Sequence, residues 1–150
     1  MYKHILVPVD GSETAQQAVH SAAAMARAFG SKVTVLYVID PFPFSGLGSD
    51  FAYGQAEYQN AARAEARTST EQAQAVLAQA GVHSSITVSE AHAAWRGILD
   101  TAGHIGADLI VMGSHGRSGL EKVVLGSVAQ RVLSHASLPV MVVRESCCAN

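Results

Sequence analysis

Three glycines and a serine form a spaced motif in the last third of the chain. Two residues separate Gly113 from Gly116, nine separate Gly116 from Gly126, and Ser127 follows directly. The motif lies between a run typical of a buried strand and a helical pattern. Glycine lets a backbone approach a ligand closely, and the first N–H groups of a helix, at the positive end of its dipole, bind anions. The spacing therefore predicts a phosphate-binding loop of a nucleotide site.

The rest of the chain places this motif in a regular alternation of strand and helix patterns. The predicted strands cover residues 3–9, 32–39, 85–89, 107–113 and 139–144, and the predicted helices cover residues 12–29, 56–80, 94–104 and 127–136. Such alternation indicates a parallel sheet with helices on both faces. Ligands of these sheets bind beyond the carboxyl ends of the strands, where the strand order reverses. Asp10, Asp40 and Gly113 stand at three strand ends, which is a second argument for a nucleotide site.

The helical period also predicts caps and buried faces. Asp10 and Glu13 are spaced as an N-cap with its capping-box partner, and Gly30 is placed to end that helix. Residues 40–55 form a connection rich in proline, glycine and aromatic residues, and residues 85–89 alternate as in an edge strand with one wetted face. The side chains predicted to face inward are Ala15, Ala18, Val19, Ala22, Met25, Ala26 and Phe29 in the first helix, Ala62, Ala66, Ala73, Val76, Leu77 and Ala80 in the second, and Ala129, Val132, Leu133 and Ala136 in the last.

Composition narrows the class of protein. Apolar residues make up 49% of the 150 and charged residues 15%, so we expect one domain over residues 1–150, with an ordered core at about residues 2–145 and a tail at residues 146–150. The formal net charge is −2 and the basic residues are scattered, so no nucleic-acid surface is expected.

The absence of long apolar segments predicts a cytoplasmic protein without a membrane partner. No segment approaches the roughly 18 apolar residues of a membrane span, and the apolar run at the N-terminus is too short for a signal peptide. Cys147 and Cys148 are adjacent in the polar tail. We expect free thiols there, with an intermolecular disulfide as the alternative.

Other nucleotide and catalytic motifs are missing from the sequence. No Gly-x-Gly-x-x-Gly follows the first predicted strand, and Lys122 does not follow a glycine as the lysine of a P-loop does. A Gly-x-Ser-x-Gly nucleophile motif is also absent. The seven histidines are dispersed and have no zinc-ligand spacing.

The glycine spacing, together with residues 3–14 and 138–144, resembles the universal stress protein family, whose ATP-binding signature is Gly-x2-Gly-x9-Gly-Ser/Thr. Every fixed position of that signature is matched, and the resemblance covers nearly the whole chain. It implies an α/β fold: a Rossmann-like, adenine-nucleotide alpha hydrolase-like three-layer sandwich with five parallel strands in the order 3-2-1-4-5. Members commonly form homodimers through the C-terminal strand, here residues 139–144, and an open sheet edge favours such pairing.

The resemblance also implies ATP as the ligand. Asp10 would accept hydrogen bonds from the ribose hydroxyls, the Val38 backbone would contact adenine, and Gly113 would lie against the ribose. The phosphates would be held by the Ser127 hydroxyl and by the backbone N–H groups of Gly116, Gly126, Ser127 and Val128. Mg²⁺ or Mn²⁺ would be held mainly by phosphate oxygens and water, so no dedicated metal site on the protein is expected. The candidate site comprises Pro8, Val9, Asp10, Val38, Met112, Gly113, Gly116, Arg117, Gly126, Ser127 and Val128.

Several candidates also have purely structural interpretations. Asp10 is compatible with an N-cap alone, the pair at 126–127 with a simple helix start, and Gly113 and Gly116 with a tight turn. Arg117 and Lys122 are suited to screen phosphate charge or to stand as solvated loop cations.

Two further features of the sequence leave alternatives open. His115 is more consistent with an exposed or turn-stabilising histidine than with a catalytic base. The aromatic residues of the long connection suit a lid, a partner surface or a satellite cluster on the sheet; they are Phe42, Phe44, Phe51, Tyr53 and Tyr58.

The expected function is that of a cytoplasmic stress-response sensor or regulator that binds ATP and hydrolyses it slowly at most. No residue is assigned a catalytic role, because no group is evident that would orient water or stabilise charge in phosphoryl transfer. One alternative is a nucleotide-dependent enzyme, an ATPase or an adenylate-transferring ligase, on the same scaffold. The other is a dimeric interaction module without nucleotide.

Overall fold

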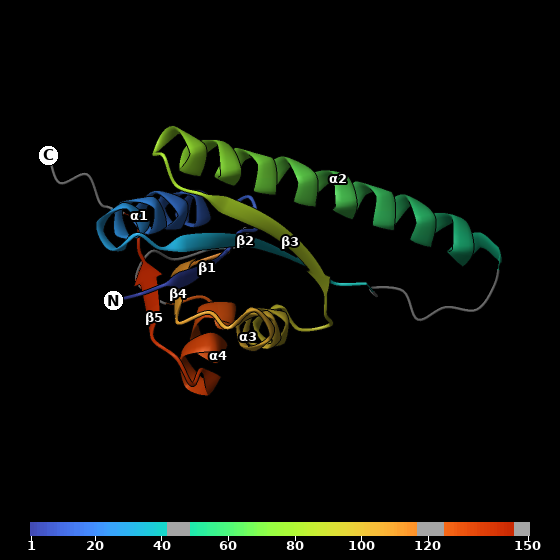
Figure 1. Cartoon of the computed structure of the whole chain (residues 1–150). Helices are drawn as coiled ribbons and strands as arrows, with labels where there is room; N and C mark the ends of the chain where they lie inside the picture. Colours follow the sequence, from blue (N-terminus) through green and yellow to red (C-terminus); the bar gives the residue numbers. More distant parts are fainter. Residues whose placement is uncertain (42–48, 117–124, 146–150) are drawn as a thin grey trace, which may run out of the picture.

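The computed structural model describes residues 1–41, 49–116 and 125–145, with the backbone alone at residues 49–53 (Figure 1). These residues form one five-stranded sheet in which every pairing is parallel. The strands are β1 (His4–Pro8), β2 (Lys32–Ile39), β3 (Ser84–Glu90), β4 (Leu109–Gly113) and β5 (Val140–Val143). Their order, β3-β2-β1-β4-β5, confirms the predicted order. The strand order reverses between β1 and β4, which is the position where such sheets bind ligands.

Two layers of helices cover the sheet (Figure 1). One face is covered by α1 (Glu13–Phe29) and α2 (Ser49–Gln79), and the other by α3 (Ala94–Ile105) and α4 (Ser127–His135). Successive side chains of a strand point to opposite faces. Ile5 and Val7 therefore belong to the core under α1 and α2, whereas Leu6 belongs to the core under α3 and α4. This burial on both faces explains the continuous apolar runs of the central strands.

The first turn of α1 corrects the predicted N-cap. Ser12 is the N-cap, and its Oγ accepts a hydrogen bond from the Ala15 N–H at 3.2 Å. Asp10 instead accepts from the Ser12 N–H at 2.9 Å through Oδ1, an arrangement in which an aspartate stabilises the turn after it. Gly11 has a φ of 85°, which moves the chain out of the capping geometry expected at Asp10. The predicted stop is confirmed, because Gly30 ends the helix in the left-handed conformation.

Helix α2 begins at Ser49, earlier than the predicted start at residue 56. Glycine and the preceding aromatic residues disfavour helix in isolation, and yet Gly54 lies inside it. The C-terminal part of α2 packs on the sheet through buried Ala66, Ala73 and Leu77, as predicted. Its N-terminal turns extend beyond the sheet (Figure 1).

Three apolar groups are more exposed than their patterns predict. Phe29 lies at the end of α1 and is exposed, and its ring meets that of Tyr2 edge-on. Leu133 faces solvent on α4. β3 is an edge strand, as predicted, but Ile86 and Val88 are themselves exposed, because β3 has a neighbouring strand on one side only.

Candidate functional site

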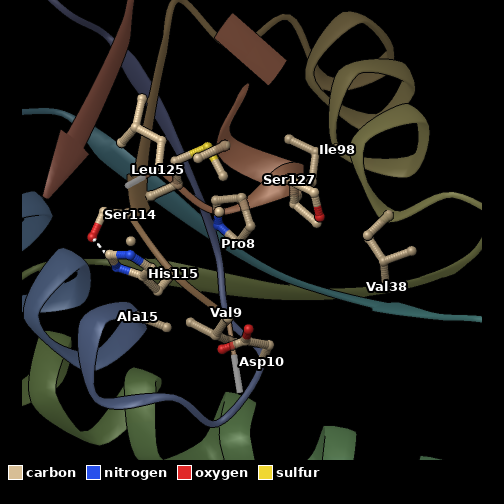
Figure 2. A pocket seen from close by; sticks show the side chains of 17 residues that line it. Pro8, Val9, Asp10, Ala15, Val38, Ile98, Ser114, His115, Leu125 and Ser127 are labelled. Carbon is tan, nitrogen blue, oxygen red and sulfur yellow. Dashed lines mark hydrogen bonds between the residues drawn. The ribbon is translucent and has the colours of Figure 1, made fainter. Parts of the chain in front are cut away.

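A cavity of about 440 Å³ opens at the carboxyl ends of β1 and β4 (Figure 2), within the size range of small-molecule sites. It is lined by Pro8, Val9, Asp10, Ala15, Val38, Ala94, Ile98, Met112, Gly113, Ser114, His115, Gly116, Leu125, Gly126, Ser127, Val128 and Ala129. All of the candidate site residues except Arg117 are among them. Arg117 and Lys122 lie outside the described residues. The fold thus brings segments that are far apart in sequence around one hollow.

The Asp10 carboxylate lies beside Gly116, in the loop that follows β4. Oδ1 is engaged by the Ser12 N–H, whereas a Cβ on Gly116 would stand 2.9 Å from Oδ2. A side chain at position 116 would therefore displace the carboxylate. The absence of a Cβ leaves one oxygen of Asp10 available beside the loop to accept a hydrogen bond.

Gly113 is required by the packing of β4 on α1. A Cβ at this position would lie 2.7 Å from Thr14 Oγ1 and 2.9 Å from the Ala15 nitrogen. These distances are shorter than real contacts of a Cβ atom. The packing of α1 on β4 therefore requires glycine at position 113, independently of any contact with a ribose.

The loop after β4 is tied to α1 through the His115 carbonyl. Thr14 Oγ1 donates to this oxygen at 2.5 Å, and Ser12 Oγ lies 3.5 Å from it. The His115 ring contacts Ser114 Oγ through Nδ1 at 2.9 Å. Its Nε2 is buried and has no hydrogen-bond partner. His115 is therefore a turn-stabilising residue at the cavity wall, as one of its two interpretations predicted.

The N-terminus of α4 completes the polar side of the cavity. Gly126 is the N-cap and makes no side-chain capping bond. Its N–H donates to the Ser114 carbonyl at 2.7 Å, and a Cβ here would lie 3.1 Å from the same oxygen. Gly126 thus joins the two loops closely. The first N–H groups of a helix lack intrahelical acceptors, so those of Ser127 and Val128 suit an anion.

The other side of the cavity is apolar. Val38, the last residue but one of β2, and Ile98 of α3 both line it (Figure 2). Ala94, one turn before Ile98 on α3, and Met112 of β4 line it as well. Gly97 permits this approach, because a Cβ there would stand 2.9 Å from Val38 Cγ1. A flat heterocycle fits a compartment of this kind. The residues of α3 were not among the candidates, and the only signal for them is the apolar spacing of that helix.

The groups whose pKa is shifted lie at the opposite end of the strands. Burial and the positive charge of Lys32 lower the pKa of His4. Desolvation raises the pKa of Asp108, but the N–H groups of Lys3 and His4 donate to its carboxylate and lower this pKa overall. These groups join the amino ends of β1 and β4, away from the cavity. Among the described residues, no group of three or more His, Cys, Asp or Glu side chains is placed to hold a metal ion.

Comparison with known proteins adds to this geometry. The model of the universal stress protein family matches residues 1–144. The chain belongs to this family. Universal stress protein MJ0531 of Methanocaldococcus jannaschii is 34% identical, over 97% of this chain and 84% of that protein. Universal stress protein MJ0577 of the same organism is 32% identical, over 96% of each.

Solved structures share the fold of this universal stress protein. The structure of MJ0577 has a TM-score of 0.84 and 31% identity, and the match covers 98% of this chain and 99% of that one. Universal stress protein UspA from Lactobacillus plantarum has a TM-score of 0.83 and 32% identity, with 95% and 98% covered. A universal stress protein from Archaeoglobus fulgidus in complex with dAMP has a TM-score of 0.69 and 26% identity, with 95% and 98% covered. No helix in the described part of the chain has the length and apolar character that crossing a membrane requires.

Proposed function

We propose that this universal stress protein binds ATP in the cavity and acts as a cytoplasmic sensor or regulator of the stress response. The observation that carries the proposal is the convergence of the Asp10 turn, the loop after β4 and the N-terminus of α4 on a cavity whose other side is apolar. A related protein of the family is solved with dAMP, which supports an adenine nucleotide as the class of ligand.

The two sides of the cavity would hold different parts of the nucleotide. The base would lie against Val38 and Ile98, and the ribose near the available oxygen of Asp10. The phosphates would meet the N–H groups of Gly116 and of the first turn of α4, where the helix dipole favours negative charge. Any Mg²⁺ or Mn²⁺ would be held through the phosphates and water.

The titratable side chains of the cavity favour binding over fast hydrolysis. Asp10 is held by the Ser12 N–H, and His115 is held against Ser114. Rapid phosphoryl transfer needs a group that positions water and a cation that stabilises the transition state. In this proposal the second oxygen of Asp10 bonds the ribose, and the described residues that line the cavity include no lysine or arginine. We expect turnover below about one per second, the low end of typical enzymes.

The edge strand β5 supports the homodimer as part of the proposal. It pairs with β4 on one side, and Met141 is exposed. An uncovered edge can pair with a second chain. Light scattering at micromolar concentration is expected to give the mass of a dimer, and a monomer mass would contradict this part of the proposal.

The site is tested by titration calorimetry with ATP and Mg²⁺ on the wild type and on Gly126→Glu. The variant places a carboxylate at the entrance of α4, so we expect its ATP affinity to fall at least about a hundredfold, or roughly 2.7 kcal/mol. Gly103→Glu is the matched control, because Gly103 is exposed on α3 and has open space where a Cβ would stand.

The outcomes of this titration separate a site defect from a folding defect. Circular dichroism on both variants establishes that they fold, and mass spectrometry of denatured wild type identifies any nucleotide that copurifies. Equal affinity for ATP in Gly126→Glu and the wild type would refute the site, as would a wild type that binds no adenine nucleotide.

A further inference from the structure

The single tryptophan of the chain lies in the first turn of α3, where it meets α4. The Trp95 ring and the His135 ring have centroids 4.5 Å apart and planes inclined by 30°. Trp95 is half-buried and packs against the core under α3 and α4. The indole therefore joins the outer surfaces of the two helices.

Two arginines flank this indole. The guanidinium carbon of Arg96 lies 5.1 Å from the ring centroid, and that of Arg131 lies 5.9 Å from it, both within the range of cation–π attraction. Arg131 and His135 are four residues apart on α4, so they share a face of that helix. The His135 Nδ1–H donates to the Arg131 carbonyl oxygen at 2.9 Å. We call these four residues the Trp95 face.

The two arginines of the Trp95 face form no ion pair within the described part of the chain. Arg96 and Arg131 are exposed, and no described carboxylate lies within 4 Å of either guanidinium. A cation–π contact uses the charge of a guanidinium but satisfies none of its five N–H donors. An overall net charge of −2 therefore coexists with a local surface that offers two unpaired guanidinium forks.

Packing between helices accounts for only part of this arrangement. The buried half of Trp95 helps to fix α3 on α4, and an aliphatic side chain could do the same. The exposed half, with an arginine on either helix, has the composition of an interface centre, where tryptophan and arginine are enriched. Guanidinium groups pair with carboxylates in bidentate geometry, which lysine does not match.

We propose that the Trp95 face is the docking surface for an acidic segment of a protein partner. Carboxylates of that segment pair with Arg96 and Arg131, and an apolar side chain between them packs on the exposed part of the indole. The proposal stands apart from nucleotide binding. Its position nevertheless matters, because Ala94 and Ser127, at the starts of the same two helices, line the cavity. A partner and a nucleotide would contact the same pair of helices.

The test uses Trp95 as its own reporter, since no other tryptophan is present. The probe is a synthetic peptide of alternating glutamate and leucine, titrated into the full chain while tryptophan emission is recorded. We expect a saturable change in emission, and at least about tenfold weaker binding when glutamine replaces glutamate in the peptide. Anisotropy of a labelled peptide gives a second measurement that does not depend on the indole.

Charge reversal locates the binding. In Arg96→Glu/Arg131→Glu, the affinity for the acidic peptide is expected to fall at least about tenfold. Arg63→Glu/Arg67→Glu makes the same change in net charge at exposed positions of α2 and should leave the affinity close to that of the wild type. Circular dichroism establishes that both variants fold.

Three outcomes would overturn the proposal. The first is a peptide that fails to saturate, and the second is equal loss of affinity in both double variants. The third is an oligouridylate that binds the Trp95 face more tightly than the acidic peptide, since this would make the surface one for nucleic acid.

Discussion

Thr14 donates its hydroxyl to the carbonyl oxygen of His115 at 2.5 Å, across 101 positions of sequence. This bond joins the first turn of α1 to the loop that follows β4. The loop carries Gly116, and its Ser114 carbonyl accepts from Gly126. The loop after β4 and the start of α4, which form the polar side of the cavity, are therefore both tied to a side chain that lies outside the glycine motif.

Thr14→Val is expected to reduce both stability and nucleotide affinity. The variant keeps the shape of the buried side chain but leaves the His115 carbonyl without its strongest donor, which should lower the free energy of unfolding by about 1–3 kcal/mol. Urea unfolding and calorimetry with ATP measure the two effects. Thr68→Val is the control, because Thr68 is exposed and bonds only within its own helix; a loss as large in the control would contradict the coupling.

Gly113→Ala is expected to destabilise the fold even without ligand. The new Cβ would meet the backbone of Thr14 at 2.8 Å as well as its hydroxyl, so α1 must shift, at a cost of about 1–3 kcal/mol. Gly103→Ala, with open space in α3, should instead stabilise by up to about 1 kcal/mol. Unfolding of the ligand-free variants is the measurement. If Gly113→Ala were as stable as the wild type, the packing argument for this glycine would fail.

The local chemistry of the sequence predicted much of this site but not the contacts between elements. The spacing from Gly113 to Ser127 placed two loops at one cavity, because the carboxyl ends of β1 and β4 meet where the strand order reverses. The predicted N-cap at Asp10 was wrong, since both Asp10 and Ser12 are good capping residues and the left-handed Gly11 between them decides the choice.

The apolar side of the cavity shows why the remaining residues were missed. Ala94 and Ile98 line it only because α3 crosses close to Val38, and Gly97 allows that crossing. Such proximity arises from tertiary packing and has no local pattern in the sequence. Similarly, the start of α2 at Ser49 is not expected from local propensity, which disfavours helix at Gly54.

Acidification is expected to destabilise the protein in two steps. The pKa of His4 is lowered in the fold, first by burial. Between the ordinary value of about 6.5 and this lower value, the unfolded chain binds a proton that the folded chain does not, so stability falls as pH falls. The lowered pKa of Asp108 adds a second loss below the ordinary aspartate value of about 3.9.

Unfolding by urea across this pH range measures how the free energy of unfolding depends on pH. His4→Gln should flatten the fall in stability just below pH 6.5, about the ordinary histidine pKa. His20→Gln makes the same substitution at an exposed position of α1 and serves as the control. A wild-type stability that rises on acidification through this range would contradict the sign of the His4 effect.

Gly97→Ala is expected to separate recognition of the base from recognition of the phosphates. Its Cβ would stand 2.9 Å from Val38 Cγ1 and 3.2 Å from Ala91 Cβ, so Val38 must move toward the apolar compartment. The loops at Gly116 and Gly126 are not touched by this change. ATP affinity should therefore fall about tenfold, or roughly 1.4 kcal/mol, while affinity for inorganic triphosphate stays within about twofold of the wild type.

Gly103→Ala makes the same substitution in the same helix without a contact and should change neither affinity. Equal weakening of ATP and triphosphate in Gly97→Ala would mean that the apolar compartment does not hold the base, because a ligand without a base would then sense the same displacement.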